Sequence, residues 1–265
     1  MSRPTVLITG ASSGIGESLA REYARLGYDL VLCARRVDRL TQLAQELNAL
    51  GAQAEAVACD VTQVSQVEAA FARARQRFGR LDVVIANAGV GYTRSLEKSS
   101  WSDIEDTFRT NVEGVFHTTK AALPLLKESR GKLVFIGSAM SYLALPESAA
   151  YCISKFGVRA FADSIRSELK PYGIRVILVC PGFVATEIRT TQGTRRDPIP
   201  GWLNMPAATA ARQIARGVAR GSKELHITFH AKVAIFVERH FPWLIDFGMW
   251  LSSSWGDKMT KDMNK

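Results

Sequence analysis

Short apolar runs rich in valine, isoleucine and leucine alternate along the chain with stretches that have helical hydrophobic periodicity. The apolar runs predict seven strands, over residues 5–10, 28–34, 54–60, 81–89, 131–138, 174–182 and 224–229. The periodic stretches predict helices near residues 15–27, 38–50, 64–78, 101–128, 150–170 and 207–220. Strands that are apolar on both faces are typical of a parallel sheet between helices. The pattern therefore predicts an α/β fold with a doubly wound, Rossmann-like parallel sheet, helices on both faces, and ligands beyond the carboxyl ends of the strands.

The length of 265 residues suits one large α/β domain, and no linker, internal repeat or low-complexity tract interrupts the pattern. We predict a single domain over residues 1–230 and an apolar, aromatic extension over residues 231–265 that packs on or near it. Lys232, Glu238 and Pro242 interrupt the extension, so it is not expected to span a bilayer. Three interpretations remain: it covers the core or a subunit interface, forms a wall of a substrate pocket, or touches a membrane surface.

The composition, with 47% hydrophobic and 22% charged residues, is that of a globular protein. A formal net charge of +9 suits nucleic acid, an anionic membrane surface or a phosphorylated ligand, or serves only solubility. Because no run of five or six like charges occurs, nucleic acid is not an expected partner.

Four widely spaced cysteines without a C-x-x-C motif suit a reducing compartment, and the N-terminal residues lack the pattern of a signal peptide. We therefore expect a cytoplasmic protein. The histidines lack the carboxylate or cysteine pattern of a metal site, so we expect no metal. We interpret them as structural or surface residues; they are His117, His226, His230 and His240.

A glycine-rich turn, T-G-A-S-S-G-I-G, links the first predicted strand to the first predicted helix. Gly10, Gly14 and Gly16 let the backbone turn tightly and approach a pyrophosphate, which the free N–H groups of the helix attract. The spacing is G-x-x-x-G-x-G, and it differs from the G-x-G-x-x-G of many dinucleotide folds. The turn predicts a dinucleotide site.

Tyr151 and Lys155 stand four residues apart in a predicted helix, so their side chains share a face. A tyrosine has an ordinary pKa near 10, which makes it a usable acid but a poor base at neutral pH. A lysine ammonium beside it favours the phenolate and moves the tyrosine pKa toward the working range. The pair is therefore a candidate for proton transfer.

The glycine turn resembles that of the classical short-chain dehydrogenase/reductase family, and further motifs follow in the order of that family. They are N-A-G at 87–89 after the fourth strand, Asn111 in the long fourth helix, Ser138 at the end of the fifth strand, Y-x-x-x-K at 151–155, and P-G at 181–182 with Thr186 after the sixth strand. The resemblance extends over about residues 4–230 and covers the predicted domain.

The resemblance implies an oxidoreductase that moves a hydride between a nicotinamide cofactor and a carbonyl or alcohol group. It assigns Tyr151 as the general acid or base, with Lys155 as its electrostatic partner and as a ligand of the nicotinamide ribose. It assigns Ser138 to a hydrogen bond with the substrate oxygen, and Asn111 to a water that supplies protons to Lys155.

The resemblance also implies a cofactor-binding set. The glycine turn receives the pyrophosphate, the residues after the third and fourth strands contact the adenosine, and those after the sixth strand fix the carboxamide. The set is Gly10, Ser12, Ser13, Gly14, Ile15, Gly16, Arg35, Arg36, Asp60, Val61, Asn87, Ala88, Gly89, Tyr151, Lys155, Pro181, Gly182, Val184 and Thr186.

The end of the second predicted strand indicates which nicotinamide is bound. In dinucleotide folds an acidic residue there binds the ribose 2′-hydroxyl. Here Ala34 is followed by Arg35 and Arg36, with no acid at that position. A carboxylate would repel a 2′-phosphate, whereas guanidinium groups pair with it through charge-assisted bonds. The sequence therefore favours NADP(H) over NAD(H).

We expect an NADP(H)-dependent oxidoreductase that interconverts a ketone and a secondary alcohol, with a bulky apolar or lipid-like substrate suggested by the extension. The alternatives are a non-catalytic NADP(H)-binding protein that reports redox state and a 3-oxoacyl-thioester reductase. The expected partners are a small carbonyl or alcohol molecule and further copies of the chain, in a homo-dimer or homo-tetramer. A weak peripheral membrane contact through the extension is also considered, and residues 190–206 are expected to form a flap over the nicotinamide.

Overall fold

The structure is a computed structural model that describes residues 3–187, 200–201, 203–245 and 247–248 of the chain. Most of the expected flap over residues 190–206 and the end of the extension lie outside the described residues.

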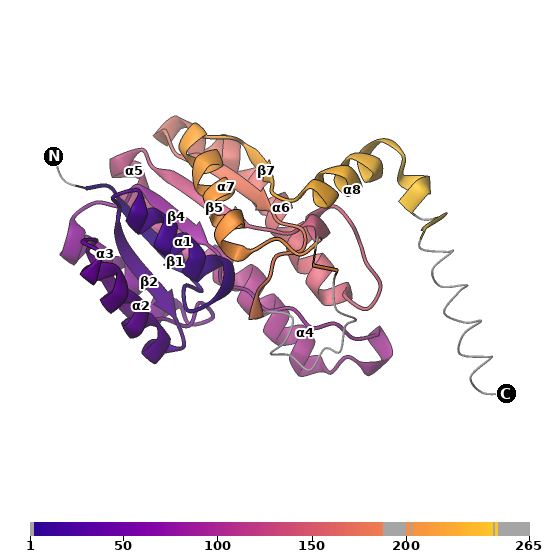
Figure 1. The fold of residues 1–265 in the computed structure, drawn as a ribbon, viewed down its shortest axis with the longest axis horizontal. Helices are drawn as coiled ribbons and strands as arrows, with labels where there is room; N and C mark the ends of the chain where they lie inside the picture. Colours follow the sequence, from indigo (N-terminus) through magenta and orange to yellow (C-terminus); the bar gives the residue numbers. More distant parts are fainter. Residues whose placement is uncertain (1–2, 188–199, 202, 246, 249–265) are drawn as a thin grey trace.

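Seven parallel strands form the centre of the fold (Figure 1). They are β1 (Thr5–Thr9), β2 (Asp29–Ala34), β3 (Ala54–Ala58), β4 (Val83–Ala86), β5 (Lys132–Ile136), β6 (Arg175–Cys180) and β7 (Glu224–His226). Their order is β3-β2-β1-β4-β5-β6-β7, with Val6 of β1 paired to Leu30 on one side and Val83 on the other. The chain thus runs outward from β1 in both directions, so the order reverses between β1 and β4. This confirms the doubly wound sheet, and such a switch point is where ligands bind.

Helices cover both faces of the sheet (Figure 1). They are α1 (Gly14–Arg25), α2 (Val37–Ala49), α3 (Val64–Phe78), α4 (Trp101–Phe108), α5 (Gly114–Ser129), α6 (Ala149–Leu169), α7 (Ala207–Arg220) and α8 (Phe229–His240). Short helical turns lie between these elements: η1 (Leu96–Lys98), η2 (Arg109–Glu113), η3 (Ala139–Ser141) and η4 (Lys170–Tyr172).

The core consists of two apolar layers, one on each side of the sheet. On one face, Leu19 of α1, Leu40 of α2 and Ile214 of α7 pack over strand residues. On the other, Phe71 of α3, Leu126 of α5 and Val158 of α6 do the same. The five inner strands have buried side chains on both faces, which explains their nearly continuous apolar sequences, whereas the edge strands β3 and β7 are half-buried.

The long helix expected over residues 101–128 is interrupted. Helix α4 ends at Phe108, a π-helical turn, η2, covers Arg109–Glu113, and α5 begins at Gly114. The hydrophobic periodicity does not predict this interruption, because it accompanies tertiary hydrogen bonds of Asn111 that are described below. A π-helical turn inside a helix is frequent at functional sites.

The predicted extension begins within α8, which follows the last strand and lies at the end of the molecule opposite the N-terminus (Figure 1). Ala231 and Ile235 are buried, whereas Phe229, Val233 and Phe236 are exposed. In the part of the chain that the structure describes, no helix has both the length and the apolar character needed to cross a membrane.

Candidate active site

A cavity of about 870 Å³ opens at the carboxyl ends of the strands, at the point where the strand order reverses. Of the candidate residues from the sequence, all except Gly16 and Asn111 line it. They are Gly10, Ser12, Ser13, Gly14, Ile15, Arg35, Arg36, Asp60, Val61, Asn87, Ala88, Gly89, Ser138, Tyr151, Lys155, Pro181, Gly182, Val184 and Thr186. The cavity therefore gathers residues from six strand ends and from α6.

The glycine turn forms one wall of the cavity. Gly10 and Gly14 adopt positive φ angles of 66° and 60°, a region that glycine occupies without strain. A Cβ atom on Gly16 would lie 2.3 Å from the Gly10 carbonyl oxygen and 2.6 Å from Nδ2 of Asn87, so this position requires glycine. The first turn of α1 lines the cavity at Gly14 and Ile15, and its N-cap side chain does not cap it. Its N–H groups are suited to an anionic ligand.

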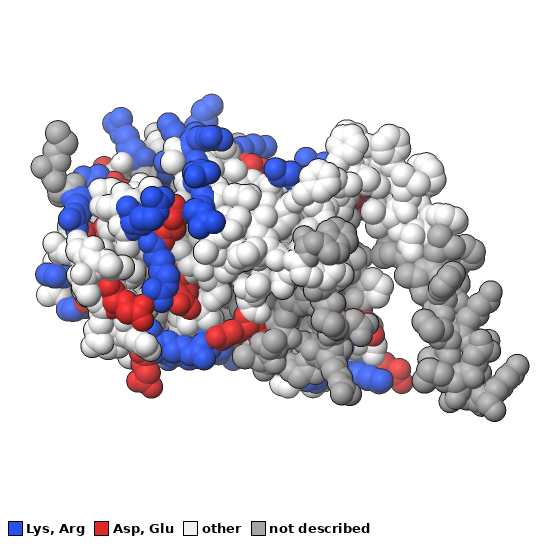
Figure 2. All heavy atoms as spheres, viewed as in Figure 1, with Lys and Arg blue, Asp and Glu red and all other residues white. Residues whose placement is uncertain are grey.

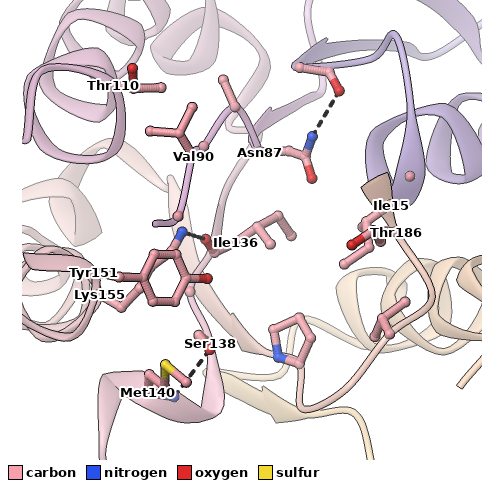
Figure 3. Close-up of a pocket in the computed structure, with 18 of the residues that line it drawn as sticks. Ile15, Asn87, Val90, Thr110, Ile136, Ser138, Met140, Tyr151, Lys155 and Thr186 are labelled. Atoms are coloured by element: carbon pink, nitrogen blue, oxygen red, sulfur yellow. Dashed lines mark hydrogen bonds between the residues drawn. The ribbon is translucent and has the colours of Figure 1, made fainter. Parts of the chain in front are cut away.

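Asn87 joins the end of β4 to this turn. Its Nδ2 donates to the carbonyl oxygens of Thr9, at 2.9 Å, and Gly10, at 3.1 Å. Figure 3 draws one of these two bonds. On the neighbouring wall, Asp60 follows β3, and its Oδ1 accepts hydrogen bonds from the backbone N–H and the hydroxyl of Thr62. Both side chains therefore stabilise the loops that line the cavity.

Arg36, after β2, makes three hydrogen bonds. Its Nε donates to Ser12 Oγ at 3.1 Å and its Nη2 to Ser13 Oγ at 2.5 Å. Its Nη1 donates to Oε2 of Glu187 at 2.8 Å, and Arg39 Nη1 donates to Oε1 of the same carboxylate at 2.6 Å. Hydrogen bonds from Arg36 and Arg39 lower the pKa of Glu187. The guanidinium of Arg36 thus connects the glycine turn to the segment after β6.

Ser138 lies directly after β5, where it caps the short turn η3. Its Oγ accepts a hydrogen bond from Met140 N–H at 3.1 Å (Figure 3), and its own N–H donates to Ser141 Oγ at 3.2 Å. This reciprocal cap fixes the hydroxyl at the edge of the cavity. Because Oγ already accepts, its hydrogen remains a donor for a ligand.

Tyr151 and Lys155 reach the cavity from the first turns of α6. The Tyr151 hydroxyl points into the cavity, on the same side as Ser138 and opposite Ile15 and Thr186 (Figure 3). The Lys155 ammonium lies 5.5 Å from the centre of the Tyr151 ring and donates to the Ile136 carbonyl oxygen at 2.9 Å. Burial lowers the pKa of Lys155 to about 8. The three side chains therefore meet at one end of the cavity.

Asn111, in the π-helical turn, lies behind this wall. Its Oδ1 accepts from Val90 N–H at 2.8 Å, and its Nδ2 donates to the Val90 carbonyl oxygen at 2.8 Å and to Ser154 Oγ at 3.0 Å. The side chain thus ties the loop after β4 to α6. The water assigned to Asn111 by the family resemblance stays a prediction.

The segment after β6 forms a further wall of the cavity, and at Thr186 it lies beside Gly14 of the glycine turn. Val184 pairs with Met205, and the backbone N–H of Phe183 donates to Nε2 of His230 at 2.9 Å. Because Nε2 accepts this bond, His230 is neutral in this arrangement, and burial lowers its pKa. His230 also lines the cavity, so the interpretation of the histidines as only structural or surface residues missed this contact.

Apolar side chains close the end of the cavity near Tyr151. They come from the segment after β5, from Phe183 after β6 and from α8; they are Met140, Leu143, Leu145, Phe183, Ala231 and Ala234. In α8, Ala231 and Ala234 line the cavity, Ile235 packs into the apolar layer under α3, α5 and α6, and the outer face is exposed.

Sequence reasoning missed further residues of this site. Glu187 pairs with an arginine 151 positions away, and no local pattern predicts such a contact. Gly91 lies just beyond the N-A-G motif, and a Cβ atom on it would lie 2.9 Å from Cδ2 of Tyr151. The sequence did offer a signal for Gly91, because a second glycine so soon after the N-A-G motif suggests a close backbone approach.

Comparisons with known proteins agree with this architecture. A family model described as short chain dehydrogenase matches residues 4–197. The chain is 34% identical over 251 residues to 11-beta-hydroxysteroid dehydrogenase-like 3 of Arabidopsis thaliana, covering 94% of this chain and 81% of that protein.

Two solved structures are similar over most of the fold. The alcohol dehydrogenase from the archaeon Thermococcus sibiricus complexed with 5-hydroxy-NADP is 32% identical, with a TM-score of 0.78, and the match covers 86% of this chain and 97% of that one. A short chain dehydrogenase/reductase from Burkholderia phymatum in complex with NAD is 25% identical, with a TM-score of 0.82, and covers 92% of this chain and 95% of that one.

Proposed function

The chain belongs to the short-chain dehydrogenase/reductase family of oxidoreductases, and on this premise we propose that it interconverts a ketone and a secondary alcohol with NADP(H) as the preferred cofactor. The observation that supports this best is the meeting of Ser138, Tyr151 and Lys155 at one end of a cavity whose other end carries the glycine turn and Arg36. Such an arrangement has room for a dinucleotide and a substrate oxygen together.

The residues present fit a nicotinamide dinucleotide. Positive φ angles at Gly10 and Gly14 give the turn its tight path, and the N-terminus of α1, which its N-cap side chain does not cap, complements the charge of a pyrophosphate. When bound, the nicotinamide supplies or accepts the hydride. Both NADP-type and NAD-bound structures occur among the similar proteins, so the choice rests on this chain's own residues. Arg35 and Arg36 at the end of β2 support NADP(H).

The chain's own residues would handle the substrate oxygen and its proton. The Ser138 hydroxyl donates to the substrate oxygen and stabilises the negative charge that develops on it. The Tyr151 hydroxyl, which points into the cavity, gives the proton during reduction and takes it during oxidation.

Lys155 supports Tyr151 electrostatically. One of its three ammonium hydrogens binds Ile136, which leaves two for acceptors such as ribose hydroxyls. With a pKa of about 8, lowered by burial, the ammonium stays mainly protonated at neutral pH and favours the phenolate of its neighbour.

The apolar end of the cavity supports a bulky apolar substrate. Leu143, Leu145, Ala231 and Ala234 all line the cavity, and the small alanine side chains leave space for a large ligand. A relative named as hydroxysteroid dehydrogenase-like agrees with a substrate of this class. We accordingly treat the described part of the extension as a wall of the substrate pocket.

Two assembly features belong to the same proposal. Exposed apolar residues on α5 and α6 suit the interface of a homo-dimer or homo-tetramer, and those on α8 suit a weak peripheral contact with a membrane surface.

The test is turnover by the Tyr151→Phe variant. We expect kcat/KM for ketone reduction to fall by about 10²–10⁴-fold, because the variant cannot give a proton. The NADPH dissociation constant should stay within about fivefold of the wild-type value, since the aromatic ring at position 151 and its packing remain. The measurement is NADPH consumption with a panel of small ketones, bulky apolar ketones and a 3-oxoacyl thioester, together with calorimetric NADPH binding.

The matched control is Tyr172→Phe, which changes a half-exposed tyrosine in η4, outside the cavity lining. Equal turnover by the Tyr151→Phe variant and the wild type would contradict the assigned acid. NADPH binding by the wild type without turnover of any panel member would favour the non-catalytic alternative.

A further inference from the structure

Glu187 is an acidic residue in the corner of the cavity where the cofactor's adenosine ribose is expected. The end of β2 carries no acid, yet the fold brings this carboxylate there from the segment after β6. It lies between two guanidinium groups, with Oε2 at 2.8 Å from Arg36 and Oε1 at 2.6 Å from Arg39. Its two oxygens therefore occupy donors that would otherwise be open to a phosphate.

We propose that Glu187 competes with the 2′-phosphate of NADP(H) for Arg36 and Arg39, and so limits how strongly the site prefers NADP(H) over NAD(H). This inference rests on the proposed function, because it concerns the same cofactor site. It assigns a selectivity role to a residue outside the family motifs found in the sequence.

The charges and contacts of the corner support competition. A carboxylate and a phosphate are both anionic acceptors that bind a guanidinium through paired N–H donors. Arg36 has its Nε on Ser12 and its Nη2 on Ser13, and Nη1 is the nitrogen that Glu187 occupies. A phosphate that takes this donor must either displace Glu187 or tolerate its charge nearby, and both weaken binding.

We expect the same carboxylate to leave the affinity for NAD(H) unchanged, because a ribose 2′-hydroxyl is neutral and does not need the guanidinium groups. The Glu187 ion pairs are partly exposed, with side-chain exposures of 42% for Arg36, 50% for Arg39 and 40% for Glu187. Ion pairs of this kind are individually weak, so a ligand can break them at modest cost.

The test is the Glu187→Gln variant, which keeps the size of the side chain and removes its charge. Dissociation constants for NADPH and NADH are measured by calorimetry for the wild type and the variant, at low and high salt. We expect the NADPH dissociation constant to fall by about three- to tenfold in the variant, and that of NADH to change by less than about twofold. The gain should shrink at high salt, because salt screens the ion pairs that the variant lacks.

The matched control is Glu128→Gln. Glu128 is a similarly exposed carboxylate that pairs with Arg75 and does not line the cavity. The control should leave both dissociation constants unchanged, and the melting temperatures of all variants are compared to verify folding.

The outcomes separate this inference from the proposed function. If the wild type prefers NADPH but the Glu187→Gln variant binds it equally or more weakly, the competition is refuted and the cofactor preference stands. If the wild type prefers NADH and the variant gains affinity for NADPH alone, the competition stands and the proposed preference is wrong. An equal gain for both cofactors would also overturn the inference.

Discussion

Lys155 is a charged group held in the interior of the protein. Its side chain is almost fully buried, and among the described residues the Ile136 carbonyl oxygen is its hydrogen-bond acceptor. Burial disfavours the ammonium and lowers the pKa of Lys155 to about 8 from an ordinary 10.5. Because the native state binds this proton less tightly than the unfolded chain, keeping the charge lowers the free energy of unfolding. The buried ammonium of Lys155 therefore lowers the stability of the folded protein.

This reasoning predicts that Lys155→Met is inactive but more stable. At pH 7 we expect the free energy of unfolding to rise by about 1–2 kcal/mol, because relief from burying the charge exceeds the loss of one hydrogen bond. The advantage should be complete below pH 8, shrink as pH rises from 8 toward 10.5, and disappear above 10.5, where lysine is neutral in both states. Thermal unfolding across this pH range is the measurement, and a variant less stable than the wild type at pH 7 would contradict the argument.

At the scale of elements, α8 matters because it has two different faces. Ala231 and Ala234 line the cavity, while Val233 and Phe236 face outward. Through His230, the first turn of α8 also binds the backbone N–H of Phe183, in the segment after β6 that lines the cavity. The helix thus borders the substrate end of the cavity without contributing to the glycine turn.

We predict that Ala234→Leu narrows the substrate range. The larger side chain fills part of the apolar end, so kcat/KM for bulky ketones should fall about tenfold or more, while that for small ketones changes by less than about twofold. Steady-state kinetics on paired ketones is the measurement. Val233→Leu, on the outer face of α8, is the matched control. A uniform loss on both substrate sizes would argue against a pocket wall.

Much of the element layout was predictable from the sequence. Continuous apolar strands and periodic helices follow from burial on both sheet faces, so the doubly wound fold was predicted. The π-helical turn was not, because it accompanies the contacts of Asn111 with Val90 and Ser154, which are distant in sequence. Residues after parallel strands share one edge, so the motif residues could be expected to meet. The contact of Glu187 with Arg36 depends on loop placement, which periodicity does not encode.

At the scale of the whole molecule, two groups of exposed apolar side chains stand out. One is on α5 and α6, where Phe116 and Ile153 are exposed and the ring centroids of Phe116 and Phe161 lie 4.1 Å apart. The other is on and after α8, where Figure 2 shows a largely uncharged surface; its members are Phe229, Val233, Phe236, Phe241, Trp243, Leu244 and Phe247. Contiguous exposed apolar surface commonly marks an interaction site.

We predict that the surface on α5 and α6 joins copies of the chain. Ile153 is 59% exposed, and placing a charge there with Ile153→Arg should shift the protein to a smaller species, because an unpaired charge is costly in an apolar interface. Light scattering after size-exclusion chromatography is the measurement. Leu50→Arg, at an exposed leucine after α2, is the control and should leave the mass unchanged. An unaltered mass for the Ile153→Arg protein would exclude this surface from the interface.

The three hydrogen bonds of Arg36 have a consequence for any attempt to redirect the proposed cofactor preference toward NADH. Arg36 holds both serines of the glycine turn as well as Glu187. Exchanging Arg36 to abolish recognition of the 2′-phosphate would therefore also loosen the glycine turn, which every nicotinamide dinucleotide uses. The affinity for NADH would then fall together with the affinity for NADPH. Arg39, which binds Glu187 from the first turn of α2, is the safer starting point for an engineer.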